Sequence, residues 1–232
     1  MTDNKNDNLL KIIVEEYIDS VSPVGSNLMV EKYFPELSSA TIRNYMVELE
    51  ERGLIYQPHT SAGRVPTLAG YQYYVEKFVS DGDITAKNKK IFDSLSKKIK
   101  LDSESIKLLA KLLAELSEEA VLIGFAPTDV YYTGISNLFR QPEFIEHQVA
   151  YSMSEIIDHL DEAMAKIFHQ IDNNVKILMG DDNPFGNGSS VILVKYKAGK
   201  NYGLVGIFGP NRMDYQENIG LIKYAQKLLE NL

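Results

Sequence analysis

The hydrophobic pattern of the chain changes at Gly53, and this change restricts the fold more than any other feature. Before Gly53, apolar residues recur at helical spacing in three short segments, residues 9–20, 27–33 and 39–52. After it, "LIYQP" and "RVPT" have the pattern of short strands around the turn-like "HTSAG", and Thr67 is placed to cap a further helix. Three short helices followed by a small hairpin are the order of elements in a winged helix-turn-helix.

The third helical segment carries the residue types of a DNA-recognition helix. Its apolar stripe is Ile42, Met46 and Leu49, so the opposite face is free to meet a ligand. Such a helix lies in the major groove, where Arg pairs with guanine, Asn with adenine, and Ser or Thr with phosphates or either base. The candidates for these contacts are Ser39, Thr41, Arg43 and Asn44. A solvated helix face is the alternative interpretation of the same residues. Ser26 is expected to cap the second helical segment, residues 27–33.

The loop "PHTSAGRVP", residues 58–66, has the composition of a wing that touches DNA. Prolines at both ends restrict the backbone and limit the entropy that is lost on binding. Small side chains let the backbone approach a groove, and Arg64 is a cation that the negative potential of a minor groove would attract. The sequence therefore predicts that Arg64 lies in or beside the minor groove. The other candidates for DNA contact are His59, Thr60, Ser61 and Gly63.

The charge of the chain argues against a broad nucleic-acid-binding surface. The formal net charge is -8, whereas non-specific DNA affinity comes from Lys and Arg side chains that neutralise phosphates. Residues 87–111 hold eight lysines against three acidic residues. Such a run is usually a solvated face, but it could add phosphate contacts or bind an acidic partner. DNA binding therefore has to depend on a small local patch and on geometry.

The remainder of the chain alternates helical and extended patterns, which predicts an α+β domain with a mostly antiparallel sheet. A hairpin at "AGKN" is expected to join the last two strands. Helices are expected at residues 86–100, 103–116, 145–171 and 214–232, and strands at residues 120–126, 129–134, 175–180, 190–197 and 202–209. The predicted division is a winged helix domain at residues 1–80, a linker and connecting helix at residues 81–103, and the sheet domain at residues 104–232.

No catalytic or metal-binding constellation stands out in the sequence. The absence of cysteine excludes disulfides, cysteine-ligated zinc and thiol catalysis, and the four histidines lack the spacing of a helical zinc site. Asp214 is expected to cap the last helix rather than to act in catalysis. Asp181 and Asp182 are expected to lie in a solvated turn rather than to bind a cation. We therefore expect no enzyme, no metal and no cofactor.

The N-terminal "MTDNKNDN" lacks the apolar region of a secretory signal. No apolar run approaches the roughly 18 residues that are needed to span a bilayer, and the best, residues 120–127, has the length of a core strand. We therefore expect a cytoplasmic protein that begins with a frayed tail.

Several long motifs resemble one family. "PVGS", "LSSATIRNYMVELEERGLIYQPHTSAGRVPT" and "GYQYYV" resemble the N-terminal domain of the heat-inducible transcription repressors of the HrcA family. "TGISNLFRQPEF" and "GLVGIFGPNRMDY" resemble the C-terminal half of that family. The resemblance implies a winged helix joined to a GAF-like domain, and a homodimer that binds an inverted-repeat operator in double-stranded DNA upstream of chaperone operons. It also implies that a GroEL-type chaperonin modulates the repressor.

The chain departs from the family pattern in its middle. Members of the family usually carry more of the GAF-like domain and an inserted dimerisation domain before the "TGISNL" motif, where residues 128–132 alone intervene here. We therefore expect a shortened GAF-like domain, and dimerisation through this domain or the helices at residues 86–116. The alternative function is a ligand-sensing or chaperone-interacting GAF-like regulatory module with weak DNA binding.

Overall fold

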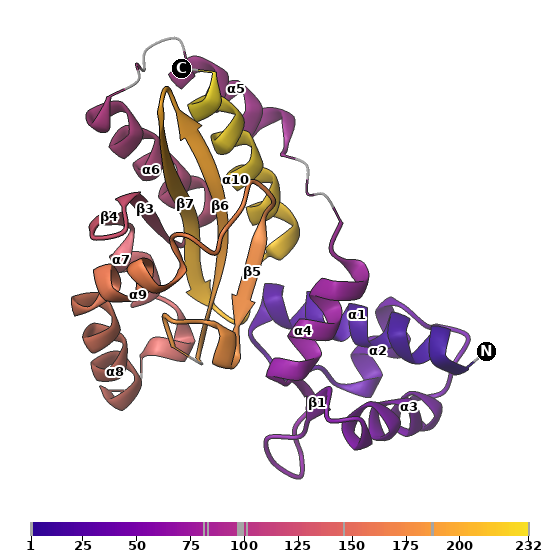
Figure 1. The fold of residues 1–232 in the computed structure, drawn as a ribbon. Helices are drawn as coiled ribbons and strands as arrows, with labels where there is room; N and C mark the ends of the chain where they lie inside the picture. Colours follow the sequence, from indigo (N-terminus) through magenta and orange to yellow (C-terminus); the bar gives the residue numbers. More distant parts are fainter. Residues whose placement is uncertain are drawn as a thin grey trace. The chain divides into compact units, whose positions relative to one another are not determined.

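The computed structural model of the chain consists of two compact units, Met1–Val79 and Ser80–Leu232 (Figure 1). The boundary between them falls one residue before the end of the predicted winged helix domain. We refer to them as unit 1 and unit 2, and describe each by itself. The structure describes residues 2–80, 82, 84–96, 100, 102–145, 147–186 and 188–231.

Unit 1 has the order of elements that the sequence predicts for a winged helix-turn-helix. Ser38 accepts a hydrogen bond from the backbone N–H of Thr41 (3.1 Å), and Thr67 accepts one from that of Gly70 (3.0 Å), so both helices start at side-chain caps. The elements are α1 (Thr2–Ser20), α2 (Ser26–Lys32), α3 (Ser39–Glu51), β1 (Ile55–Tyr56), β2 (Val65–Pro66) and α4 (Leu68–Phe78).

The core of unit 1 forms where α1 packs against α3 and α4. The predicted stripe of α3 is confirmed, because Ile42, Met46 and Leu49 are its buried residues. The prediction that Ser26 caps α2 is wrong. Gly25 occupies the N-cap position without a side-chain bond, and Ser26 is the first helical residue.

The N-terminal segment is helical from Thr2, so the prediction of a frayed tail is wrong. Asp7 explains the difference, because its side chain is only 6% exposed and is held by groups from other helices. Its carboxylate accepts a hydrogen bond from the Tyr73 hydroxyl (2.7 Å), forms an ion pair with Lys77, and lies 3.9 Å from the Arg52 guanidinium. Burial opposes ionisation of Asp7, but the hydrogen bonds from Lys77 and Tyr73 outweigh it and hold the pKa of this carboxyl below its usual value.

Unit 2 contains a five-stranded sheet with the order β4-β3-β7-β6-β5, in which every neighbouring pair is antiparallel. Together with the winged helix of unit 1, this antiparallel sheet with its helices confirms the predicted α+β fold class. Gly199, at a φ of 63°, and Lys200 form the predicted hairpin between β6 and β7. The strands are β3 (Ala120–Ala126), β4 (Asp129–Thr133), β5 (Lys176–Met179), β6 (Ser189–Ala198) and β7 (Asn201–Pro210).

Helices cover both faces of this sheet. Leu122, Leu193 and Leu204 share a core with Met164 and other residues of α9, and the side chains that alternate with them point to the opposite face. On the opposite face, α10 packs along β6 and β7 and α6 packs on β3 and β4 (Figure 1). The helices are α5 (Ala86–Ser96), α6 (Ser103–Ser117), α7 (Ile135–Leu138), α8 (His147–Asp158), α9 (Leu160–Ile167) and α10 (Tyr215–Glu230), with 3-10 turns η1 (Pro142–Phe144) and η2 (Gly180–Asp182).

Helix α5, part of the predicted linker and connecting helix, packs on α10. The rings of Phe92 and Tyr224 are 5.2 Å apart, and the Asn88 amide donates to the Glu217 carboxylate over 3.1 Å. Part of the predicted helix at residues 86–100 lies outside the described residues, because residues 97–99 are not described.

The prediction of one helix at residues 145–171 is wrong, because α8 and α9 are separated at His159. The backbone of His159 has φ -116° and ψ 23°, outside the helical region. Met153 before the break and Leu160 and Met164 after it all join the same core. The apolar period therefore continues across the break, which explains why the sequence pattern does not reveal it.

Glu119, the residue before β3, is a buried acid in unit 2. It is 5% exposed, and its Oε2 atom has no hydrogen-bond partner among the residues that the structure describes. The carboxylate packs against Gly209, where a Cβ would lie 2.3 Å from Oε2. Burial raises the pKa of Glu119 to about 8, although the positive charge of Arg212 acts in the opposite direction.

We predict that the stability of unit 2 falls as the pH rises from about 4.5 to about 8. Over this interval the unfolded chain releases the Glu119 proton at the ordinary pKa of 4.5, while the folded chain keeps it. The slope should approach about 1.4 kcal/mol per pH unit. Urea unfolding followed by circular dichroism across this range should show the fall, and Glu119→Gln should flatten it. An exposed acid of α6 provides the control, because Glu115→Gln should leave the slope unchanged.

We predict the opposite pH dependence for Asp7 in unit 1. Its lowered pKa stabilises the fold above the ordinary value of 3.8, and this contribution is lost as the pH falls through the folded value. Asp7→Asn should therefore lower the melting temperature at neutral pH by several degrees and weaken the loss of stability in acid. Thermal unfolding at pH 7 and pH 3 measures both effects. Asp19→Asn, an exposed position on the same helix, should change neither.

Candidate nucleic-acid interface

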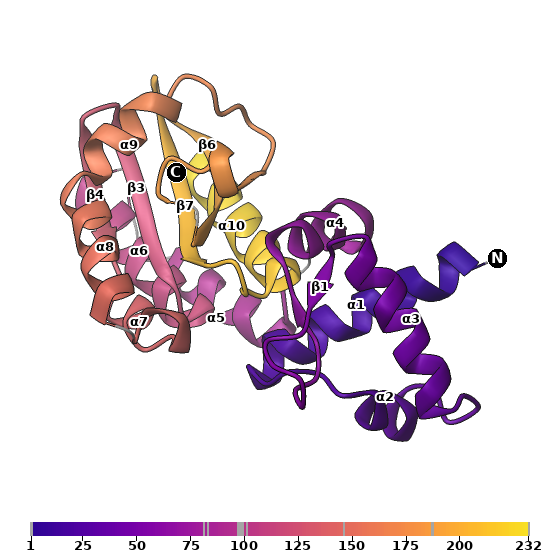
Figure 2. The same cartoon turned by 90° about the horizontal axis from the view of Figure 1, so that it is seen from below.

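A concavity of about 460 Å³ in unit 1 brings together α3, the loop before α2 and the loop between β1 and β2. We call the latter loop, residues 57–64, the wing; in Figure 1 it extends away from the helices of unit 1, and Figure 2 shows this unit from below. Five of the predicted site residues line the concavity, namely Arg43, Thr60, Ser61, Gly63 and Arg64. The other four, Ser39, Thr41, Asn44 and His59, lie on the same two elements but outside this lining.

The N-terminal half of α3 presents a polar face. Arg43 and Asn44 are exposed, whereas Ser39 and Thr41 are half-buried. The Arg43 guanidinium reaches back to two hydroxyls, since Nε donates to Ser26 Oγ and Nη2 donates to Ser39 Oγ, both over 3.3 Å. These partners are neutral and the bonds are long, so Arg43 is held in place without being neutralised.

The wing is ordered by one side chain of its own. The Gln57 amide donates to the carbonyl oxygens of Thr60 (3.1 Å) and Ala62 (2.9 Å), and the backbone N–H of Ala62 donates to the His59 carbonyl (2.8 Å). His59, Thr60 and Ser61 at the tip are exposed. The loop composition did not single out Gln57, and its only sequence signal is a long amide side chain at the start of the turn.

The base of the wing is joined to the loop before α2. Val24 and Arg64 exchange two backbone hydrogen bonds of 2.9 Å each, as neighbours in an antiparallel bridge. A Cβ at Gly63 would lie 2.4 Å from the carbonyl carbon of Val24, so this position requires glycine. The need for a small residue at Gly63 thus arises inside unit 1, and its predicted contact with DNA stays a prediction.

Arg64 is paired within unit 1. Its Nε and Nη2 atoms lie 3.1 and 3.0 Å from Oε2 of Glu50 on α3, and its side chain is 15% exposed. The predicted place of Arg64 in or beside the minor groove stays a prediction, but in this structure the guanidinium faces α3. Sequence reasoning missed Glu50 because its partner lies 14 residues away, across the turn into β1.

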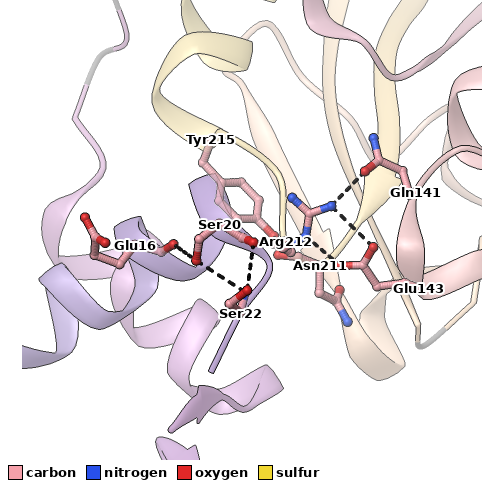
Figure 3. A network of polar contacts seen from close by, with 8 residues as sticks. All are labelled: Glu16, Ser20, Ser22, Gln141, Glu143, Asn211, Arg212 and Tyr215. Atoms are coloured by element: carbon pink, nitrogen blue, oxygen red, sulfur yellow. Dashed lines mark hydrogen bonds and ion pairs between the residues drawn. The ribbon is translucent and has the colours of Figure 1, made fainter. Parts of the chain in front are cut away.

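Arg212 and Asp214, the residues of unit 2 that invited a catalytic interpretation, make structural contacts. Asp214 accepts a hydrogen bond from the Glu217 backbone N–H (2.9 Å), which confirms that it caps α10. The neighbouring Arg212 contacts Glu143 (2.6 Å) and Gln141 (2.7 Å), so it anchors the segment around η1 (Figure 3). Within the described part of the chain, no group of three or more acidic, histidine or cysteine side chains could hold a metal ion.

Unit 2 also has a concavity of about 510 Å³ beside the "TGISNLFRQ" motif. Gly134, with a φ of 77°, and Asn137 shape it, and the Asn137 amide donates to the carbonyls of Ala114 (3.0 Å) and Glu119 (3.1 Å). Charged groups of both signs line it, including Lys111, Glu115, Glu118 and Arg140.

None of the described helices is long and apolar enough to cross a membrane.

Comparison with known proteins places the chain in a family. Residues 68–219 match the family model for the HrcA protein C-terminal domain. The heat-inducible transcription repressor HrcA of Carboxydothermus hydrogenoformans is 25% identical over 336 positions, which cover all of this chain and 98% of that protein. The repressor of the same name from Anabaena is 40% identical over 130 residues, which are 54% of this chain and 36% of that protein.

A solved structure supports the fold over the whole chain. A crystal structure of a hypothetical protein superposes with a TM-score of 0.74 at 21% identity, and covers 98% of this chain and 97% of that one.

The alignment with the Carboxydothermus repressor is 336 positions long, whereas this chain has 232 residues. At least 104 positions of the alignment, the difference, therefore have no residue in this chain. Between β3 and β4, Pro127 and Thr128 alone form the connection. By the extent of these matches, the chain belongs to the HrcA family of heat-inducible transcription repressors.

Proposed function

We propose that the chain represses heat-shock (chaperone) operons by binding an inverted-repeat operator in double-stranded DNA through unit 1. The observation that carries this proposal is that an exposed polar face of α3 and an ordered wing share one concavity. Membership in a repressor family supports it from an independent direction.

In this proposal α3 enters the major groove with its N-terminal half. Arg43 and Asn44 would read base edges, since Arg pairs with guanine and Asn with adenine, while Ser39 and Thr41 would bond phosphates or bases. The contacts of Arg43 favour this role. Its two hydroxyl partners are weak, so phosphate or guanine oxygens can replace them at little cost.

The wing would meet the DNA beside the groove that α3 occupies. His59, Thr60 and Ser61 at its tip are exposed and can reach the sugar-phosphate backbone or the minor groove. Gly63 and Arg64 belong to the same proposed interface but lie at the base of the wing. Arg64 would have to leave Glu50 to enter a groove.

We predict that a DNA titration separates a repressor from a module with weak DNA binding. The chain should prefer the inverted repeat over scrambled DNA by at least about a thousandfold. Arg43→Ala and Asn44→Ala should each reduce that preference by roughly 1–3 kcal/mol, at the base pair that each side chain reads. Lys11→Ala, which removes a cation of α1, should leave the preference unchanged. Equal affinity of the wild type for both DNAs would refute the proposal.

A two-fold operator implies a two-fold repressor. With part of the family's length absent, we propose that unit 2 supplies the dimer contact, through the sheet domain or helices α5 and α6. Sedimentation at micromolar concentration, free and on operator DNA, should show a dimer. A monomer in both conditions would contradict this.

Modulation by a GroEL-type chaperonin is part of the same proposal, and a change in operator affinity on adding the chaperonin would test it.

The alternative, a ligand-sensing or chaperone-interacting regulatory module, draws on the concavity of unit 2. Its lining carries charged groups of both signs, Lys111 and Arg140 against Glu115 and Glu118, which suits a small polar molecule. The titration on operator DNA also tests this alternative, because such a module would not discriminate the operator from scrambled DNA.

A further inference from the structure

We propose that Arg64 is a positioning residue: its ion pair with Glu50 fixes the wing against α3, and its guanidinium stays on Glu50 when DNA is bound. This inference rests on the proposed function of unit 1. It assigns Glu50 a part in the interface and changes the part of Arg64 from a groove contact to a support of the wing.

Both the backbone and the side chain of Arg64 are committed to unit 1. The backbone N–H and carbonyl are bonded to Val24, and the guanidinium makes two contacts of 3.1 and 3.0 Å with a single oxygen of Glu50. With 15% of its side chain exposed, Arg64 offers little surface to a ligand. Reaching a groove would require the pair to break, and the close packing of Gly63 on Val24 keeps the backbone from following.

Charge argues in the same direction. The Glu50 side chain is 36% exposed and belongs to the helix that is proposed to enter the major groove. If Arg64 left it, an uncompensated carboxylate would lie close to DNA phosphates, and like charges at short range repel. Arg64 therefore favours DNA binding by neutralising Glu50, without itself touching a phosphate.

The pair also sets the spacing between the two parts of the interface. Arg43 and Glu50 are seven residues apart on α3, so they lie on the same face of the helix, two turns from each other. A wing that is anchored at Glu50 is held beside the face that carries Arg43. Gln57 then fixes the tip relative to the base through Thr60 and Ala62. A bound duplex would thus meet α3 and the wing at a preset separation, with little entropy lost on binding.

Operator titrations with charge variants test this role against direct contact. If Arg64 positions the wing, Glu50→Ala and Arg64→Gln should each weaken operator binding, roughly threefold to tenfold, and the double variant should be no weaker than either. The slope of log affinity against log salt should stay at the wild-type value for the double variant, because it removes both charges of the pair and no phosphate contact is lost. Glu51→Ala, a neighbouring exposed acid of α3, is the matched control and should not weaken binding.

A charge swap gives the sharpest comparison. The double variant E50R/R64E restores an ion pair with reversed polarity, so it should recover most of the affinity that R64E alone loses. A groove contact predicts no recovery of affinity, because a carboxylate at position 64 repels DNA whether or not residue 50 is changed. Thermal unfolding of every variant confirms that unit 1 is folded under the titration conditions.

Three results would overturn the inference: tighter binding by Glu50→Ala, a salt slope lowered by about 0.9 per subunit in the double variant of Glu50→Ala and Arg64→Gln, or no recovery in the charge swap. Failure of the proposed function would give a different result. The wild-type chain itself would then not discriminate the inverted repeat from scrambled DNA.

Discussion

The backbone pairing of Val24 with Arg64 is the contact on which the candidate interface depends. It adds a third extended segment to a hairpin whose strands, β1 and β2, have two residues each. So short a hairpin has little stability alone, and its pairing with the loop before α2 fixes both the wing and the start of that helix. Gly63 makes this approach possible because it has no Cβ. The motifs "PVGS" and "SAGRVP", which are separate in the sequence, therefore pair with each other in the fold.

The two units hold their elements in place by different means. In unit 1, carboxylates with little exposed surface join helices. Asp7 is held by side chains of α4 and by Arg52, the residue after α3, and Glu16 of α1 accepts hydrogen bonds from Lys32 and Tyr33. A small domain buries less of its surface, so charge-assisted bonds take a larger share in fixing helix positions. In unit 2 the central strands are buried on both faces, and apolar packing dominates.

Pattern and motif were enough to predict most elements, and the failures have physical causes. The five strands of unit 2 and the stripe of α3 follow from local periodicity. The break at His159 was missed because apolar spacing continues through it. The start of α1 was missed because Asn6 and Asp7 are polar, and their burial depends on partners distant in sequence. Of the interface, residue types and exposure on α3 were predictable, whereas the supports Glu50 and Gln57 were not.

The sequence by itself determined most of the helices and strands, that α3 presents Arg43 and Asn44 outward, and which family the chain resembles. Helical period, caps and turn residues encode these features within a few residues of one another. The tertiary structure alone decided where the Arg64 guanidinium points. Composition marked it as a free cation on a loop of small residues, but a partner 14 residues earlier on a folded helix holds it. Ion pairing depends on distance in space, and a linear pattern carries no record of that distance.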